Sequence, residues 1–227
     1  MDNESLPKRA AGDARATVAF VDLAGFSAIA DVFGDAAAID VLDLFEELVG
    51  GSVGDDGQLI KWIGDEAMLL FPEPDVALQA LARLLPACRA EQRIPLTRCG
   101  LHHGPVIRRG SDVFGSTVNI ASRIAAFAEA GQLVATDLVA EVAKAKGVSV
   151  HELGPIRLRS IAEKVPLSLL QLAEVVDPAW IDPVCKMHAP YSAYRTTRRM
   201  GHWFCSAQCE EAYRRSPETY STSSVRS

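Results

Sequence analysis

Two short, mostly apolar runs, at residues 58–63 and 66–71, flank the dipeptide Gly64-Asp65. A link of two turn-forming residues between such runs is typical of a β-hairpin, so the pattern predicts two antiparallel strands with Asp65 in their turn. Pro72 and Pro74 follow directly and end the second strand. A hairpin requires antiparallel pairing, so this chain is not built from parallel strand–helix units alone.

Short strands and amphipathic helices continue on both sides of this hairpin. We predict further strands at 17–21, 96–101, 106–108, 132–135, 156–158 and 167–172, with a turn at Gly104-Pro105. We predict helices at 26–33, 36–49, 75–87, 117–130 and 137–146. The order of strands and helices is mixed rather than alternating, which predicts an α+β sandwich with helices packed on a mainly antiparallel sheet.

Composition excludes several classes of protein. The chain has 227 residues, 48% of them hydrophobic and 23% charged, as in ordinary soluble proteins. Its net charge of −6 argues against nucleic acid or an anionic membrane surface as a partner. No apolar run approaches the roughly 20 residues that a membrane span needs, and residues 1–15 lack the apolar core of a signal peptide. We therefore expect a cytoplasmic protein.

A change of composition near Asp177-Pro178 and Asp182-Pro183 predicts a domain boundary. We expect a tail at 1–14, a large domain at 15–175, a small domain at 180–221 and a second tail at 222–227. The small segment is rich in Cys, His, Arg and aromatic residues. At about 40 residues it is too short for a generous apolar core and would usually need a staple such as a metal ion.

Two aspartates follow predicted strands and are candidates for metal binding. Asp22 ends the first strand and Asp65 lies in the hairpin turn, where each also has a purely conformational explanation. If the hairpin pairs beside the first strand, both carboxylates meet at one end of the sheet. Carboxylates together with phosphate oxygens are the ligands that Mg²⁺ prefers. The backbone amides around Gly25 and Phe26 open a helix and are placed to receive phosphate oxygens.

A second polar group lies on the helix predicted at 117–130. Asn119 and Arg123 are four residues apart, so they share one helix face. The alternative is an ordinary solvated face. Val118, Ile120 and Ile124 indicate a partly buried helix, and polar residues on such a helix more often have a function.

Four segments together resemble the catalytic domain of class III adenylyl and guanylyl cyclases. They are residues 20–27, the hairpin with its Lys-x-x-Gly-Asp sequence at 61–71, residues 100–106 and residues 112–123. They occur in the family's order over residues 15–173, and all six expected polar positions are filled. The resemblance implies the cyclase fold, a ferredoxin-like α/β sandwich with a mainly antiparallel sheet.

The resemblance also implies roles for the polar residues. Asp22 and Asp65 would bind two Mg²⁺ or Mn²⁺ ions, while Asn119 would orient the ribose. Arg123 would stabilise the negative charge of the transition state. The basic residue that binds the triphosphate is not clear, and Arg159 and Lys164 are both candidates.

Lys61 and Asp112 would read the nucleotide base. A lysine only donates and adenine N1 only accepts, whereas a carboxylate accepts from the adenine N6 amino group. Guanine presents the reverse pattern, so this pair favours ATP over GTP. The resemblance implies that the metal aspartates come from one protomer and the other four residues from its partner. A chain that carries all six would then form a two-fold homodimer.

The C-terminal segment resembles the YHS family of small cysteine-bearing domains over residues 180–221. The resemblance is carried by Asp182-Pro183-Val184-Cys185-Lys186-Met187 and by the run from His202 to Cys209. It implies a metal-binding domain. Thiolates suit Zn²⁺ or Cu⁺, with Cys185, Cys205 and Cys209 as three ligands and His202 or His188 as the fourth. The alternative is a reduced mini-core without metal.

The sequence thus predicts an adenylate cyclase that converts ATP to 3′,5′-cyclic AMP and pyrophosphate as a homodimer, with no nucleic acid or membrane partner. Three alternatives remain. One is a guanylate cyclase, which Lys61 and Asp112 disfavour. Another is a cyclase-like module that binds a nucleotide or a partner without turnover. In the third, metal handling by the C-terminal segment is the main task.

Overall fold

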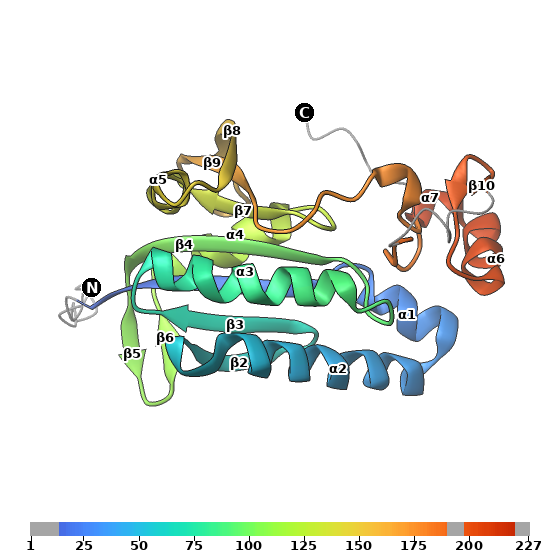
Figure 1. The fold of residues 1–227 in the computed structure, drawn as a ribbon, viewed down its shortest axis with the longest axis horizontal. Helices are drawn as coiled ribbons and strands as arrows, with labels where there is room; N and C mark the ends of the chain where they lie inside the picture. Colours follow the sequence, from blue (N-terminus) through green and yellow to red (C-terminus); the bar gives the residue numbers. More distant parts are fainter. Residues whose placement is uncertain (1–13, 190–197, 221–227) are drawn as a thin grey trace, which may run out of the picture.

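The structure is a computed structural model that describes residues 14–189 and 198–220 (Figure 1). Apart from Ala14, the two predicted tails lie outside the described residues. The elements of the larger part are, in chain order, β1 (Arg15–Leu23), α1 (Phe26–Phe33), α2 (Asp35–Val53), η1 (Gly54–Asp56), β2 (Gln58–Ile63), β3 (Glu66–Phe71), α3 (Pro74–Ala90), β4 (Thr97–Pro105), β5 (Ile107–Arg109), β6 (Asp112–Phe114), α4 (Ser116–Phe127), β7 (Leu133–Thr136), α5 (Asp137–Ala145), β8 (Ser149–Arg157) and β9 (Lys164–Gln171).

Seven strands form one sheet in the order β2-β3-β1-β4-β7-β9-β8. All neighbours in it are antiparallel except β4 and β7, which pair in parallel. The predicted hairpin is β2–β3, and it pairs through β3 with β1, which lies next to the central strand β4. The predicted α+β sandwich with a mainly antiparallel sheet is therefore confirmed.

Successive side chains of β1 point to opposite faces of the sheet, and helices cover both faces. Val21 belongs to a buried cluster that includes Phe45 of α2 and residues of α1, α3 and α5. Phe20 points to the other face and belongs to a cluster with Ala121 and Ala125 of α4. Figure 1 shows α2 and α3 across one face of the sheet and α4 behind it. Residues 16–23 of β1 are all buried, because neither face of the strand meets water there.

Two glycines in β4 bring α4 close to the sheet. A Cβ on Gly100 would lie 2.1 Å from the backbone nitrogen of Ala125, and one on Gly104 would lie 2.6 Å from Oγ1 of Thr117. The turn predicted at Gly104-Pro105 is wrong, because β4 continues through Pro105 and pairs there with Arg15 of β1. Gly104 thus makes room for a helix rather than a turn.

The next two strands form a separate small hairpin. β5 and β6 pair antiparallel, with Arg109 opposite Asp112 and Gly110 in the left-handed region at φ 63°. The sequence prediction had β5 but omitted β6, since three residues are too few to show a periodic pattern. This hairpin places Asp112 next to β2.

The C-terminal segment contains η2 (Pro178–Trp180), β10 (Arg198–Arg199), β11 (His202–Trp203), α6 (Ala207–Arg215) and α7 (Pro217–Tyr220). It lies beside α1 at one end of the molecule (Figure 1). Val184, Cys185 and Cys209 belong to the same buried cluster as α1, α2 and α3. The segment therefore packs its apolar side chains on the larger part, and the boundary expected at residues 175–180 stays a prediction.

Among the helices in the described part of the chain, none combines the length and the apolar character that crossing a membrane would need.

Candidate active site and cysteine cluster

Three carboxylates meet at one end of the central strands. Asp22 lies opposite Glu66 in the β1–β3 pairing, and Asp65 precedes Glu66 in the β2–β3 turn. Burial, and then the charge of Asp22, raise the pKa of Asp65 to about 6. The same two causes raise the pKa of Glu66 to about 7. The structure thus brings Asp22 and Asp65 together, in a group whose negative charges repel one another.

Arg98 partly offsets this charge. It lies opposite Asp22 in the β1–β4 pairing, and its Nε donates a hydrogen bond to Oδ2 of Asp22. Sequence reasoning missed both Arg98 and Glu66. The only signal for Glu66 was its position next to Asp65, and nothing in the sequence shows that Arg98 lies across from Asp22. An oxygen-rich group of this kind fits Mg²⁺ or Mn²⁺, which prefer carboxylate ligands.

The turn that follows Asp22 has the geometry of an anion-binding helix start. Gly25 adopts the left-handed conformation at φ 82° and is the N-cap of α1, which begins at Phe26. No side chain caps this end. The first amides of a helix have no carbonyl partner within the helix and carry the positive end of its dipole. The turn therefore presents backbone amides beside the carboxylates, and the phosphate contacts expected of Gly25 and Phe26 stay a prediction.

Lys61 and Asp112 form an ion pair between β2 and β6. Nζ of Lys61 lies 2.9 and 2.7 Å from the two carboxylate oxygens of Asp112. The same Nζ lies 5.7 Å from the ring centroid of Phe114. Hydrogen bonds from Lys61 and from the backbone amide of Val113 lower the pKa of Asp112. The structure brings the two predicted base-reading residues together, with both side chains partly open to solvent.

Asn119 and Arg123 lie four residues apart on α4, and both are exposed. Within residues 14–189 and 198–220, neither side chain makes a hydrogen bond or an ion pair to Asp22, Asp65, Lys61 or Asp112. The structure of one chain therefore does not join this pair to the carboxylates. Both side chains remain available to a molecule outside the chain.

Two surface cavities are lined by other residues. One of about 370 Å³ lies among Asp137, Lys144 and Glu152, between α5 and the β8–β9 hairpin. Another of about 210 Å³ lies beside α2 and includes Leu59 and Trp62. Neither is lined by the six predicted active-site residues.

The triphosphate candidates Arg159 and Lys164 both lie near the link between β8 and β9, and both are exposed. The structure gives neither of them a contact with the carboxylates.

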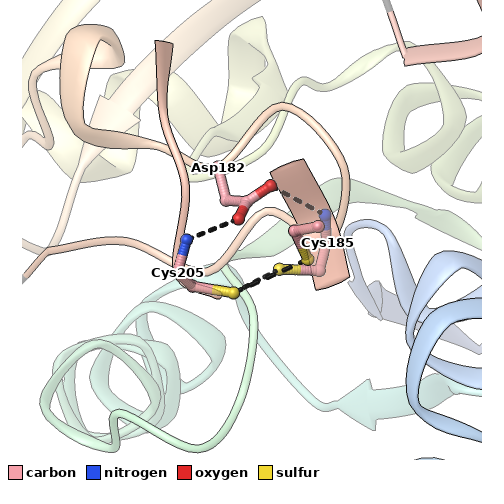
Figure 2. A group of neighbouring side chains, drawn as sticks. Asp182, Cys185 and Cys205 are labelled. Carbon is pink, nitrogen blue, oxygen red and sulfur yellow. Dashed lines mark hydrogen bonds between the residues drawn. The ribbon is translucent and has the colours of Figure 1, made fainter. Parts of the chain in front are cut away.

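A second cluster gathers three thiols and one carboxylate in the C-terminal segment. The ligand atoms of Asp182, Cys185, Cys205 and Cys209 all lie within 4.8 Å of one another. Sγ of Cys205 is 3.4 Å from Sγ of Cys185 and 3.7 Å from Sγ of Cys209. Figure 2 shows Asp182 and Cys185 facing Cys205.

Asp182 is fully buried and holds the two segments of this cluster together. Its Oδ1 accepts from the amides of Val184 at 2.8 Å and Cys185 at 3.4 Å, and its Oδ2 accepts from the amide of Cys205 at 2.7 Å. Figure 2 shows the bonds from Cys185 and Cys205. His202 lies elsewhere, with its Nε2 3.0 Å from the hydroxyl oxygen of Tyr213. His188 is buried, and burial lowers its pKa to about 4. Among the described residues, neither histidine belongs to the group of four donors.

The thiols are electrostatically unequal. Hydrogen bonds from Cys185 and then Cys205 lower the pKa of Cys209 to about 5. The pKa of Cys185 is raised, chiefly by its hydrogen bond to Cys205. Cys209 also lies in the first turn of α6, where its amide donates to Oγ of the N-cap Ser206 at 3.1 Å. The positive end of that helix favours a thiolate at this position.

Comparison with known proteins now gives the class to which this fold and site belong. The model of the adenylate and guanylate cyclase catalytic domain matches residues 10–171, so the chain belongs to that family. The pH-sensitive adenylate cyclase MT1302 of Mycobacterium tuberculosis is 32% identical over 160 residues, which are 69% of this chain and 40% of that protein. The chain thus spans about two fifths of the length of this curated relative.

Solved structures agree on the fold. An adenylate cyclase of Trypanosoma brucei, determined in its monomeric state, has a TM-score of 0.65 at 19% identity over 76% of this chain and 95% of that one. The guanylate cyclase domain of RhGC from Catenaria anguillulae, in complex with GTP, has a TM-score of 0.62 at 19% identity over 71% and 98%. Adenylate and guanylate cyclases share this fold. The fold therefore does not distinguish ATP from GTP, and the choice between them depends on the residues of the site.

Proposed function

We propose that this chain is an adenylate cyclase, which converts ATP to 3′,5′-cyclic AMP and pyrophosphate in a homodimer with two Mg²⁺ or Mn²⁺ ions per site. The observation that carries the proposal is the meeting of Asp22 and Asp65 at the end of β1, directly before the helix start at Gly25. Family membership supports it, since the matched region contains all six polar positions.

In the proposed reaction, the ribose 3′ oxygen attacks the α-phosphorus and loses its proton. The bond from the α-phosphorus to the oxygen of the β-phosphate breaks, and pyrophosphate leaves. Bound Mg²⁺ or Mn²⁺ supplies positive charge to the phosphates and lowers the pKa of the attacking hydroxyl. Asp22 and Asp65 hold these ions, and the amides at Phe26 receive phosphate oxygens.

Two residues of α4 would complete the reaction centre. Asn119 orients the ribose so that its 3′ oxygen lies in line with the leaving group, a contribution of position rather than of proton transfer. Arg123 places a fixed positive charge where negative charge develops on the phosphate oxygens. Their exposure in a single chain supports a role toward the other protomer.

Lys61 and Asp112 support ATP as the substrate rather than GTP. The pair presents one donor and one acceptor side by side, held by their mutual ion pair. Adenine offers the matching acceptor at N1 and donor at N6, whereas guanine would leave unpaired groups on both sides. A guanylate cyclase is the alternative that this argument disfavours.

Apolar side chains near these residues support a dimer. Ile63 of β2 is 49% exposed, and Ile107 and Phe114 of the β5–β6 hairpin are each 45% exposed. Ile63 shares β2 with Lys61, Phe114 shares β6 with Asp112, and Ile107 of β5 lies opposite Phe114. Apolar side chains gathered around polar ones are typical of protein–protein interfaces. We propose that this surface forms the two-fold interface and that each site takes its carboxylates from one protomer and α4 from the other.

For the chain as a whole, we propose residues 15–175 as the cyclase domain and residues 180–221 as a YHS-like module that is packed on it.

The test is cyclic AMP formation from ATP by purified protein with Mg²⁺ or Mn²⁺, with Asp22→Asn as the matched control. We expect product with the wild-type chain, little with GTP, and none with the control. Nucleotide binding by a folded dimer that forms no cyclic AMP would instead support a module that binds without turnover. Cyclic GMP as the main product would overturn the choice of base.

A further inference from the structure

The cysteine cluster has the donors and the spacing of a closed site for a thiophilic ion. Three sulfurs and one carboxylate converge from two separate segments, and all but Cys205 are buried. Around a tetrahedral Zn²⁺, with Zn–S bonds of about 2.3 Å, neighbouring sulfurs lie about 3.8 Å apart. The observed separations of 3.4 and 3.7 Å are close to this value. They are too long for a disulfide, whose sulfurs lie about 2.05 Å apart.

Asp182 can serve as a fourth metal ligand and still keep its hydrogen bonds to the backbone. Its Oδ1 accepts from the amides of Val184 and Cys185, and its Oδ2 accepts from the amide of Cys205. A carboxylate oxygen has two lone pairs, so Oδ2 can accept the bond from Cys205 and still ligate an ion. Backbone bonds of this kind also fix the orientation of a ligand, as the outer partners of metal sites commonly do.

The cluster is attached directly to the turn after Asp22. The carbonyl of Lys186, next to Cys185, accepts from the amide of Leu96 at 3.1 Å. The carbonyl of Leu96 in turn accepts from the amide of Ala24 at 2.9 Å. Two backbone hydrogen bonds therefore lead from a residue beside a thiol ligand to the turn that begins α1.

Gly25 makes a second attachment. A Cβ at Gly25 would lie 2.9 Å from both the carbonyl carbon and the oxygen of Cys185. The backbone of Cys185 thus rests on the N-cap of α1 at a distance that only glycine allows. Displacement of the Cys185 peptide would remove packing from the turn.

We propose that Asp182, Cys185, Cys205 and Cys209 bind one thiophilic cation, Zn²⁺ or Cu⁺, and that the bound ion holds the turn at Ala24 and Gly25 in place. Ion binding fixes the position of the peptide at Cys185. The hydrogen bonds through Leu96 and the contact with Gly25 then restrict the motion of the amides at the start of α1. The effect on catalysis rests on the proposed cyclase function. The binding of the ion and the ordering of the turn do not.

The first experiment measures metal content in the full chain, reduced and then supplied with Zn²⁺ or Cu⁺ in the presence of excess Mg²⁺. We expect about one equivalent of bound ion. Cys205→Ala should lower the affinity at least tenfold, whereas Cys88→Ala, the same change at a cysteine outside the cluster, should leave it unchanged. Less than about one-tenth of an equivalent, or equal affinity in Cys205→Ala, would overturn the site. A disulfide between Cys185 and Cys205 in place of bound metal would also overturn it.

The second experiment measures amide hydrogen exchange with and without the ion. Exchange at Ala24 and Leu96 should slow at least threefold when the ion binds, while peptides of the β8–β9 hairpin serve as an internal control and stay unchanged. Cys205→Ala should abolish the difference. Full occupancy without slower exchange at these two amides would overturn the attachment. Asp22→Asn should give the same exchange result, so failure of the cyclase proposal is distinguished from failure of this one.

Discussion

Asp22, at the end of β1, and Asp65, in the β2–β3 turn, lie close enough that the charge of Asp22 adds to the effect of burial on Asp65 and raises its pKa to about 6. This proximity arises because β3 pairs with β1 in the register that sets Asp22 opposite Glu66. Negative charges held together in this way need positive charge nearby, and Arg98 supplies part of that charge. Two divalent ions would supply the rest.

The metal role of these carboxylates is tested by Asp65→Asn. The amide keeps the size of the side chain but removes the charge that binds Mg²⁺ or Mn²⁺, so we expect cyclic AMP formation to fall at least about 100-fold. Thermal unfolding should show a folded protein, since loss of a repelling charge does not destabilise the fold. Activity near the wild-type rate in this folded variant would contradict the assignment.

The raised pKa values predict how pH affects the metal-free protein. Asp65 and Glu66 bind protons more tightly in the folded state, with pKa values of about 6 and 7. Their contribution to the free energy of unfolding is therefore largest at low pH and is lost as pH rises from about 4 to about 7. Addition of Mg²⁺ should restore stability above pH 7 and should have little effect below pH 5.

The effect of the Glu66 charge on stability is tested by Glu66→Gln, with the free energy of unfolding measured by chemical denaturation. We expect the variant to be about 1 kcal/mol more stable than the wild type at pH 8 without metal, a value reduced for the partial exposure of Glu66. At pH 4 the two proteins should be nearly equal. A variant that is less stable than the wild type at pH 8 would show that the charge of Glu66 is favourably paired.

Base selection is tested by Lys61→Glu together with Asp112→Cys. The double change removes the donor for adenine N1 and the acceptor for N6, so we expect kcat/KM for ATP to fall roughly 10- to 100-fold. The variant should also gain measurable use of GTP relative to ATP. Unchanged kinetics with ATP would show that these two residues do not contact the base.

The shared site predicts rescue between inactive variants. Asp22→Ala and Arg123→Ala should each be inactive alone. After subunit exchange, half of randomly paired dimers contain both variants, and each of these has one intact site of two, so about a quarter of the wild-type activity should return. Subunit exchange is verified with differently labelled protomers. Exchange without any recovered activity would contradict a site that is built from two protomers.

The packing of α4 on β4 is tested by Gly100→Ala. The added Cβ would lie 2.1 Å from the backbone nitrogen of Ala125, so the helix or the strand has to move, and we expect a loss of about 3 kcal/mol in the free energy of unfolding. Gly50→Ala is the matched control, because nothing lies within 4 Å of its Cβ position in α2. That change should stabilise the protein by about 0.5–1 kcal/mol. Equal stability of the two variants would show that α4 adjusts freely.

The sequence by itself determined the hairpin at Gly64-Asp65 and the α+β class, because a two-residue turn and apolar periodicity are local patterns. The candidate residues came from polar positions in these patterns and, for Lys61 and Asp112, from the resemblance to the cyclase family. Only the tertiary structure placed Glu66 and Arg98 beside Asp22, because strand register joins residues far apart in the chain and no local pattern encodes it. In the C-terminal segment, the cysteines were evident from the sequence. The convergence of Asp182 with them follows from how the segment folds on itself, and the contact of Cys185 with Gly25 follows from how it packs beside α1.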